Sequence, residues 1–137
     1  MGNREIKFRA LKDDMSNCNF VYGQLVYDAI GATRITAVDK SGEGLTFHSC
    51  INGTEGQFTG LKDKNGVDVY EGDVCNYLLD LTPFSDEEDL SNYVPKTGIV
   101  KFVDFRWIFE SEKSNDFIAC ISQIEIIGNI HENHELL

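Results

Sequence analysis

Apolar and polar residues alternate with a period of two along most of the chain, which is the pattern of β-strands with one buried face. At the start, Ile6, Phe8 and Ala10 alternate with Lys7 and Arg9, so the first predicted strand has one face in solvent. Turn residues recur about every 8 to 12 positions, a spacing typical of all-β proteins. The sequence therefore predicts a mainly β fold, with a curved sheet or partial barrel and one or two short helices at most.

The later strands are predicted from the same alternation and from β-branched residues. A bend or bulge is expected at Gly23, between residues 20–22 and 25–27. Residues 117–121 and 124–130 are aliphatic, and we expect them to be central strands broken at Ser122 and Gln123. The other predicted strands are residues 34–38, 45–50, 74–79, and a hairpin of 98–103 with 107–110 around 104–106.

The segment of residues 78–97 differs in composition from the rest of the chain. It holds both prolines and a concentration of acids at Asp80, Asp86, Glu87, Glu88 and Asp89. Ser85 and Glu88 have the spacing of a capping box, which predicts a short helix over residues 86–92. We interpret residues 78–97 as an acidic surface insertion within a single domain of residues 1–137.

Net charge limits the classes of partner. The 137 residues include 12 Lys plus Arg and 23 Asp plus Glu, a net charge of −11. A general nucleic-acid binder needs basic residues to displace counterions, so nucleic acid is an unlikely partner, and binding to anionic membranes is disfavoured on the same ground. The sequence contains neither a signal-peptide pattern nor an apolar stretch of about 20 residues, so we expect a cytoplasmic protein.

The acidic residues Asp63, Asp68, Glu71 and Asp73 raise the question of a metal site, but their spacing does not fit a calcium loop. Capping of nearby turns by these side chains is the interpretation we favour. His131 and His134 lie three residues apart rather than the four that a zinc-binding helix requires.

The other candidate motifs for metal, phosphate or thiol chemistry are incomplete. His48 and Cys50 share one strand face without further ligands nearby in the sequence. The glycines lack the pattern of a phosphate loop, and the 4 cysteines lack a Cys-x-x-Cys pair and are expected to be free thiols. The sequence therefore favours a protein without catalytic residues, metal or cofactor.

Three blocks resemble the YopX family of phage and prophage proteins. They are the segments REIKFRA at residues 4–10, TGLKDKNGVDVYEGDV at residues 59–74 and IEIIGNIHEN at residues 124–133. The chain departs from the family at Leu11, where an aromatic residue is usual, and at His134, where proline is common. The resemblance implies a small β-rich protein with a partial barrel of SH3-like character, encoded by a phage or an integrated element. It implies no activity.

Three hypotheses on function remain open. The first is a non-enzymatic module that binds a host or phage protein through the acidic residues 86–89 and Trp107. The second is a small barrel that binds nucleic acid through Lys7, Arg9, Arg34 and Trp107. The third is a structural component that self-assembles through strand edges as a homo-oligomer. An exposed aromatic surface would combine Trp107 with Phe105 and Phe109. Core packing is the alternative role for these rings, since aromatic residues on strands more often face the core.

Overall fold

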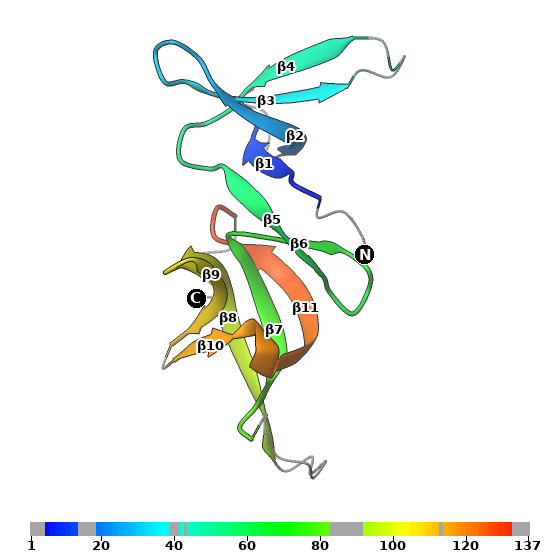
Figure 1. Ribbon diagram of the computed structural model, residues 1–137, viewed down its shortest axis with the longest axis vertical. Coiled ribbons are helices and arrows are strands. Elements are labelled where there is room, and N and C mark those ends of the chain that lie inside the picture. Colours follow the sequence, from blue (N-terminus) through cyan, green and yellow to red (C-terminus); the bar gives the residue numbers. More distant parts are fainter. Residues whose placement is uncertain are drawn as a thin grey trace. The chain divides into compact units, whose positions relative to one another are not determined.

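The computed structural model describes residues 5–13, 19–38, 42, 44–82, 92–112 and 114–132. Among these residues, strands β1 to β11 form two antiparallel sheets, and the one short helix described is a 3₁₀ turn (Figure 1). Neither sheet closes into a barrel. The predicted mainly β fold is confirmed. The chain divides into two compact units, Met1–Gly60 and Leu61–Leu137. The single domain expected from the sequence stays a prediction.

The first unit is built on one antiparallel sheet in the order β4-β3-β2-β1-β5 (Figure 1). Its strands are β1 (Phe8–Leu11), β2 (Phe20–Tyr27), β3 (Thr33–Val38), β4 (Leu45–Ser49) and β5 (Gly56–Lys62), of which β5 ends beyond the unit boundary. The alternation seen in the sequence separates two faces. Ala10, Ile35 and Cys50 are buried on one face, and Phe8, Val21 and Leu25 pack against them.

The second unit is built on the sheet β10-β9-β8-β7-β11. Its strands are β6 (Asp68–Tyr70), which pairs with the end of β5, then β7 (Asp73–Asp80), β8 (Tyr93–Val103), β9 (Arg106–Ser111), β10 (Asn115–Phe117) and β11 (Ile121–Asn129). The core of this unit consists of Val69, Cys75, Tyr77, Val100, Trp107 and Phe109. The ring centroids of Tyr77 and Phe109 lie 5.0 Å apart in an edge-on arrangement.

Two details of the predicted strands are wrong. Residues 118–120 form the 3₁₀ helix Ile118–Cys120 instead of a strand. Strand β11 lies at the edge of its sheet and not at its centre, because only β7 pairs with it as a neighbouring strand. Its aliphatic side chains instead pack from this edge against the core of the second unit, with Ile121, Ile124 and Ile126 among the partly buried residues.

The ladder between β7 and β8 narrows the predicted insertion. Pairing extends from Val74 opposite Ile99 to Asp80 opposite Tyr93, so residues 78–80 and 93–97 are parts of regular strands. Residues 81–92 lie between these two strands in the sequence. The expected helix from Asp86, together with the acidic residues 86–89, falls in residues 83–91, which lie outside the described part of the chain.

The free edge of β11 is covered by the turn that follows β5. Asp63 is buried, and its Oδ2 accepts a hydrogen bond of 3.2 Å from the backbone N–H of Ile126. The N–H of Lys64 donates to the carbonyl of Ile124 at 2.7 Å. This turn thus occupies polar groups that an edge strand would otherwise leave open.

Candidate functional site

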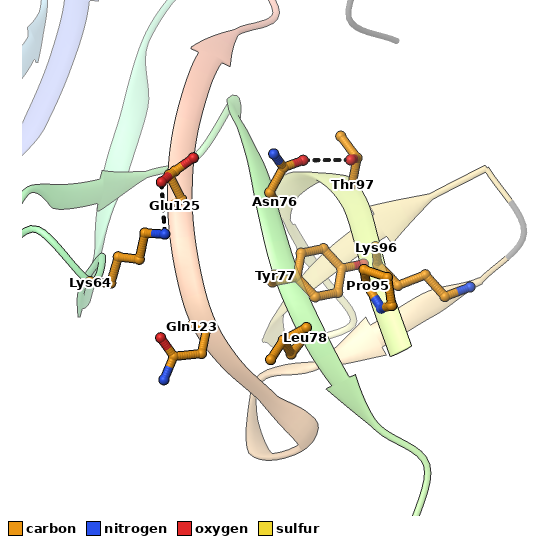
Figure 2. A pocket seen from close by; sticks show the side chains of 9 residues that line it. All are labelled: Lys64, Asn76, Tyr77, Leu78, Pro95, Lys96, Thr97, Gln123 and Glu125. Carbon is orange, nitrogen blue, oxygen red and sulfur yellow. Dashed lines mark hydrogen bonds and ion pairs between the residues drawn. The ribbon is translucent and has the colours of Figure 1, made fainter. Parts of the chain in front are cut away.

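A groove of about 530 Å³ opens on one face of the second unit (Figure 2). Its position follows from strand register, because residues paired across an antiparallel ladder point to the same face. Asn76 on β7 lies opposite both Thr97 on β8 and Glu125 on β11. Leu78 lies opposite Pro95 on the same face. The full lining is Lys64, Asn76, Tyr77, Leu78, Pro95, Lys96, Thr97, Gln123 and Glu125.

The polar side chains of the groove are mostly engaged with one another. Thr97 Oγ1 donates to Asn76 Oδ1 at 2.6 Å, and Lys64 Nζ lies 2.9 Å from Glu125 Oε2 (Figure 2). Gln123 sits at a register irregularity in β11 with φ of 54°, a conformation that is uncommon outside glycine. The groove therefore offers amide, hydroxyl and ion-pair contacts, and it contains neither His nor Cys.

Behind the groove, on the opposite face of β7, a buried polar cluster braces β10. The hydroxyl of Tyr77 donates to Asp116 Oδ2 at 2.5 Å, and the hydroxyl of Ser114 donates to Asp116 Oδ1 at 2.8 Å. Burial and the Asp116 carboxylate together raise the pKa of Tyr77 well above its ordinary value. A phenol held protonated in this way acts as a hydrogen-bond donor and not as a base, so this cluster has a structural role.

The turn between β8 and β9 presents an exposed aromatic side chain. We call residues 103–106 the hairpin tip. Asp104 and Phe105 have φ of 52° and 64°, and the Phe105 side chain is 97% exposed. Three further apolar residues of this unit are also exposed, namely Phe102, Val103 and Phe117. Two-residue hairpin turns with positive φ at both positions usually contain glycine or asparagine, so a phenylalanine here is a departure from local preference.

Comparison with known proteins identifies the family. The family model described as YopX protein matches residues 7–137. The chain belongs to the YopX family. The resemblance seen in the three sequence blocks is thereby confirmed over nearly the whole chain. No curated protein matches it.

The fold of this YopX-family chain is also found in a solved structure. The crystal structure of protein EF1440 from Enterococcus faecalis is similar with a TM-score of 0.54 and 23% sequence identity, over 98% of this chain and 99% of that chain. This likeness shows the fold alone. Within the described residues, no helix has both the length and the apolar character needed to cross a membrane.

The residues proposed from the sequence for partner binding fall in different places. Trp107 is only 9% exposed and its ring lies in the core of the second unit, which corrects the expectation of a surface role. The physical reason is strand parity: Trp107 and Phe109 point to the same face of β9, and Phe109 is fully buried. Phe105 has the same parity, but it lies in the turn and not on the strand. The acidic residues 86–89 lie outside the described part of the chain.

The predicted nucleic-acid face combines residues that already have partners. Lys7, Arg9 and Arg34 belong to the first unit, and Trp107 belongs to the core of the second. Arg9 is buried, and its guanidinium lies over the Phe20 ring, 4.0 Å from the ring centre.

The two other cations are engaged as well. Arg34 contacts Asp28 at 3.3 Å and Ser49 at 3.2 Å, and Lys7 lies 3.4 Å from Glu5. These contacts leave little free positive charge for phosphates.

The acidic residues of the middle block cap turns. Asp63 Oδ1 accepts hydrogen bonds from the N–H groups of Asn65 and Val67, both at 2.9 Å. Asp73 Oδ2 accepts one from Tyr70 N–H at 2.8 Å. The capping interpretation is confirmed for these two residues. Among the described residues, no group of three His, Cys, Asp or Glu side chains is arranged to hold a metal ion.

Two of the remaining candidate residues make short local hydrogen bonds. The Cys50 thiol lies 3.3 Å from the carbonyl oxygen of His48, its neighbour two residues earlier on the strand. The N–H of His131 donates to Asn129 Oδ1 at 2.9 Å, while His134 lies outside the described part of the chain.

The sequence suggested an exposed aromatic surface at Trp107, Phe105 and Phe109, and of these three side chains the structure exposes Phe105 alone. The sequence carried a signal for Phe105: it lies with Asp104 in the predicted turn of residues 104–106, and two-residue hairpin turns usually contain Asp-Gly or Asn-Gly. A bulky residue in such a turn cannot be explained by local preference, which makes it a candidate for a role outside the fold.

Proposed function

We propose that this YopX-family protein is a non-enzymatic protein-binding module, encoded by a phage or prophage and acting in the cytoplasm of its host. The partner is a host or phage protein. The observation that carries the proposal is Phe105, which is 97% exposed while held at a φ of 64°.

The conformation and exposure of Phe105 lower the stability of the fold, and no packing of its ring offsets this cost. The left-handed conformation costs a residue other than glycine roughly 1–2 kcal/mol. The exposed ring also forgoes the gain of burying an aromatic side chain in the core. Strain of this kind is typical of residues that act on a ligand or partner, and aromatic anchors dominate the energetics of many protein interfaces.

The charge of the chain defines the chemistry of the partner. Asp104 lies next to Phe105 in the turn, and the whole chain carries a net charge of −11. Residues 86–89 add a run of four acids between β7 and β8. We therefore propose a partner with an apolar pocket rimmed by Lys and Arg, which would receive the ring of Phe105 and attract the acidic chain.

The groove supports a binding role more than a catalytic one. Its lining provides no His or Cys, and its Lys64–Glu125 and Asn76–Thr97 pairs are mutually satisfied. A Ser, Thr or Cys nucleophile with an adjacent His base, one arrangement for covalent catalysis, is absent from these lining residues.

Replacing Phe105 by glycine tests the proposal with two opposite readouts. We expect Phe105→Gly to weaken partner binding at least about 30-fold, because a central aromatic anchor contributes about 2 kcal/mol or more. The same change should raise the free energy of unfolding by about 1 kcal/mol, because Asp-Gly suits this turn. Affinity capture from nuclease-treated host lysate identifies the partner, and titration with the purified partner measures the affinity.

The control is Ile30→Ser, which removes a large exposed apolar side chain from a turn of the first unit. It should leave the affinity unchanged. Partner binding that survives Phe105→Gly would overturn the role of the hairpin tip. Binding that disappears once nucleic acid is digested would favour the nucleic-acid hypothesis instead.

The acidic run provides a separate prediction. Converting Asp86, Glu87, Glu88 and Asp89 to Asn and Gln removes four negative charges, and should slow association with a basic partner and weaken its dependence on salt. Stopped-flow association rates at two ionic strengths measure the effect. A variant that converts Glu110 and Glu112 in the same unit to Gln removes two charges and controls for net charge. An equal effect per charge removed in the two variants would exclude residues 86–89 from the proposal.

A further inference from the structure

Strand β4 differs from the other strands at sheet edges. β6, β10 and β11 lie at edges and carry Asp68, Asp116 and Glu125, respectively. β6 and β10 have three residues each, and β11 is covered by the turn at Asp63. β4 has five residues, Leu-Thr-Phe-His-Ser, without an acid, Lys, Arg or Pro. Exposed edge strands are usually protected by such residues, because open edges pair with other chains.

The hydrogen bonds around β4 show which of its backbone groups face outward. In an antiparallel strand, the N–H and C=O of one residue point to the same side, and successive residues alternate. The carbonyl of Ser49 accepts a bond from Asp13 N–H at 2.9 Å, and Cys50 N–H donates to Thr33 on β3 at 3.0 Å. The backbone N–H and C=O groups of even-numbered residues therefore point to β3. Those of Leu45, Phe47 and Ser49 point outward from the edge of the sheet.

Asp13 already occupies the outward carbonyl of Ser49, so, among the residues that the structure describes, the open part of the edge consists of Leu45 and Phe47. These two residues flank Thr46 symmetrically. Their side chains also share one face of the sheet and are 64% and 58% exposed. An edge with this arrangement is complementary to itself across a two-fold axis.

We propose that β4 pairs antiparallel with β4 of a second copy of this chain, with the two-fold axis at Thr46. Leu45 then lies opposite Phe47 of the second copy, and each such pair exchanges both N–H···O=C hydrogen bonds. Two apolar cross-strand pairs form on the exposed face. The contact is isologous, as in most homodimers.

The absence of charge from β4 argues for a second copy as the occupant. Two chains of net charge −11 repel each other, so a contact between copies is best placed where neither contributes an acid. In this register, Thr46 lies opposite Thr46 of the second copy. His48 lies beyond the paired residues 45–47. No charged side chains are brought together within the paired segment.

Sedimentation velocity over a concentration series tests the proposal. Wild-type protein is expected to dimerise, and Phe47→Lys should raise the dissociation constant at least tenfold. Ile30→Lys makes a similar change at an exposed turn of the same unit and should leave dimerisation intact. Wild-type protein that stays monomeric at the highest usable concentration overturns the proposal, as does a dimer that Phe47→Lys leaves unchanged.

Mixing variants tests the register and guards against a misfolded variant. When Phe47→Lys is mixed with Leu45→Glu, the mixed dimer places the introduced lysine opposite the introduced glutamate and retains one Leu45–Phe47 pair. This mixture should dimerise more tightly than either variant alone. Phe47→Lys mixed with Phe47→Glu gains no such pair and should not. If the second mixture pairs and the first does not, the proposed axis at Thr46 is wrong.

Discussion

Replacing Asp63 by alanine is expected to lower the free energy of unfolding by about 3 kcal/mol, because charge-assisted hydrogen bonds to buried groups are worth about 1.5–3 kcal/mol each. The Asp63 side chain is only 7% exposed and accepts bonds from the N–H groups of Asn65, Val67 and Ile126. Alanine leaves all three donors without this acceptor. Water can reach those of Asn65 and Val67, which limits the loss, whereas the bond to Ile126 covers the edge of β11.

Urea unfolding followed by circular dichroism measures the loss. The matched control is Asp68→Ala, which removes the same group from the next strand. Asp68 forms a surface ion pair with Lys62 at 2.7 Å, and such pairs contribute about 0–1 kcal/mol. Equal losses for the two variants would show that the Asp63 bonds do not stabilise the turn as described.

The pH dependence gives the prediction a second readout. Burial alone would raise the pKa of Asp63, but the N–H groups of Val67, Ile126 and Asn65 outweigh it and hold the pKa below its ordinary value of 3.8. A carboxylate with a depressed folded-state pKa contributes its stability above the unfolded-state pKa, and that contribution is lost as pH falls through the folded-state pKa. The difference between wild type and Asp63→Ala should therefore be constant near neutral pH and decrease in acid.

The strands of the second unit were largely predictable because their signals are local. Alternation and turn dipeptides gave residues 74–79 for β7 and the β8–β9 hairpin around residues 104–106. The capping role of Asp63 was also predictable, since Asp two residues before Asn-Gly favours a turn. Its bond to Ile126, 63 positions later, was not, because nothing local indicates which strand edge a turn will meet.

The candidate surfaces were harder to predict because exposure depends on long-range pairing. Phe105 and Trp107 have the same parity, and only the two-residue turn at Asp104-Phe105 separates an exposed ring from a buried one. Leu45 and Phe47 alternate like core residues of an ordinary strand. Their exposure follows from the position of β4 at the edge, which is set by the order of the strands in the sheet.

Gly23 shows how a local signal can have a non-local cause. The sequence indicated a bend or bulge at this glycine, and the structure places it within β2, where it pairs with Phe8 of β1. A Cβ at position 23 would overlap the carbonyl oxygen of Thr36 and lie 3.0 Å from its carbonyl carbon. The backbone of β3 thus approaches β2 so closely that only glycine fits.

We therefore expect Gly23→Ala to lower the free energy of unfolding by about 3 kcal/mol or more, at or above the upper end of typical overpacking costs. The clash is with backbone, so no side-chain rotation relieves it, and β3 must move away from β2. Moving β3 also disturbs Ile35, which is fully buried in the core of the first unit.

Gly31→Ala is the matched control for Gly23→Ala. Gly31 has φ of 83°, and a Cβ added there would meet nothing within 4 Å. Alanine at this position therefore costs only the strain of the backbone conformation, roughly 1–2 kcal/mol. Urea unfolding ranks the two variants, and amide chemical shifts locate the disturbance, which should centre on β2 and β3 in Gly23→Ala. A Gly23→Ala protein as stable as Gly31→Ala would mean that β3 can separate from β2 at little cost. The close approach would then be a consequence of the glycine and not a requirement of the fold.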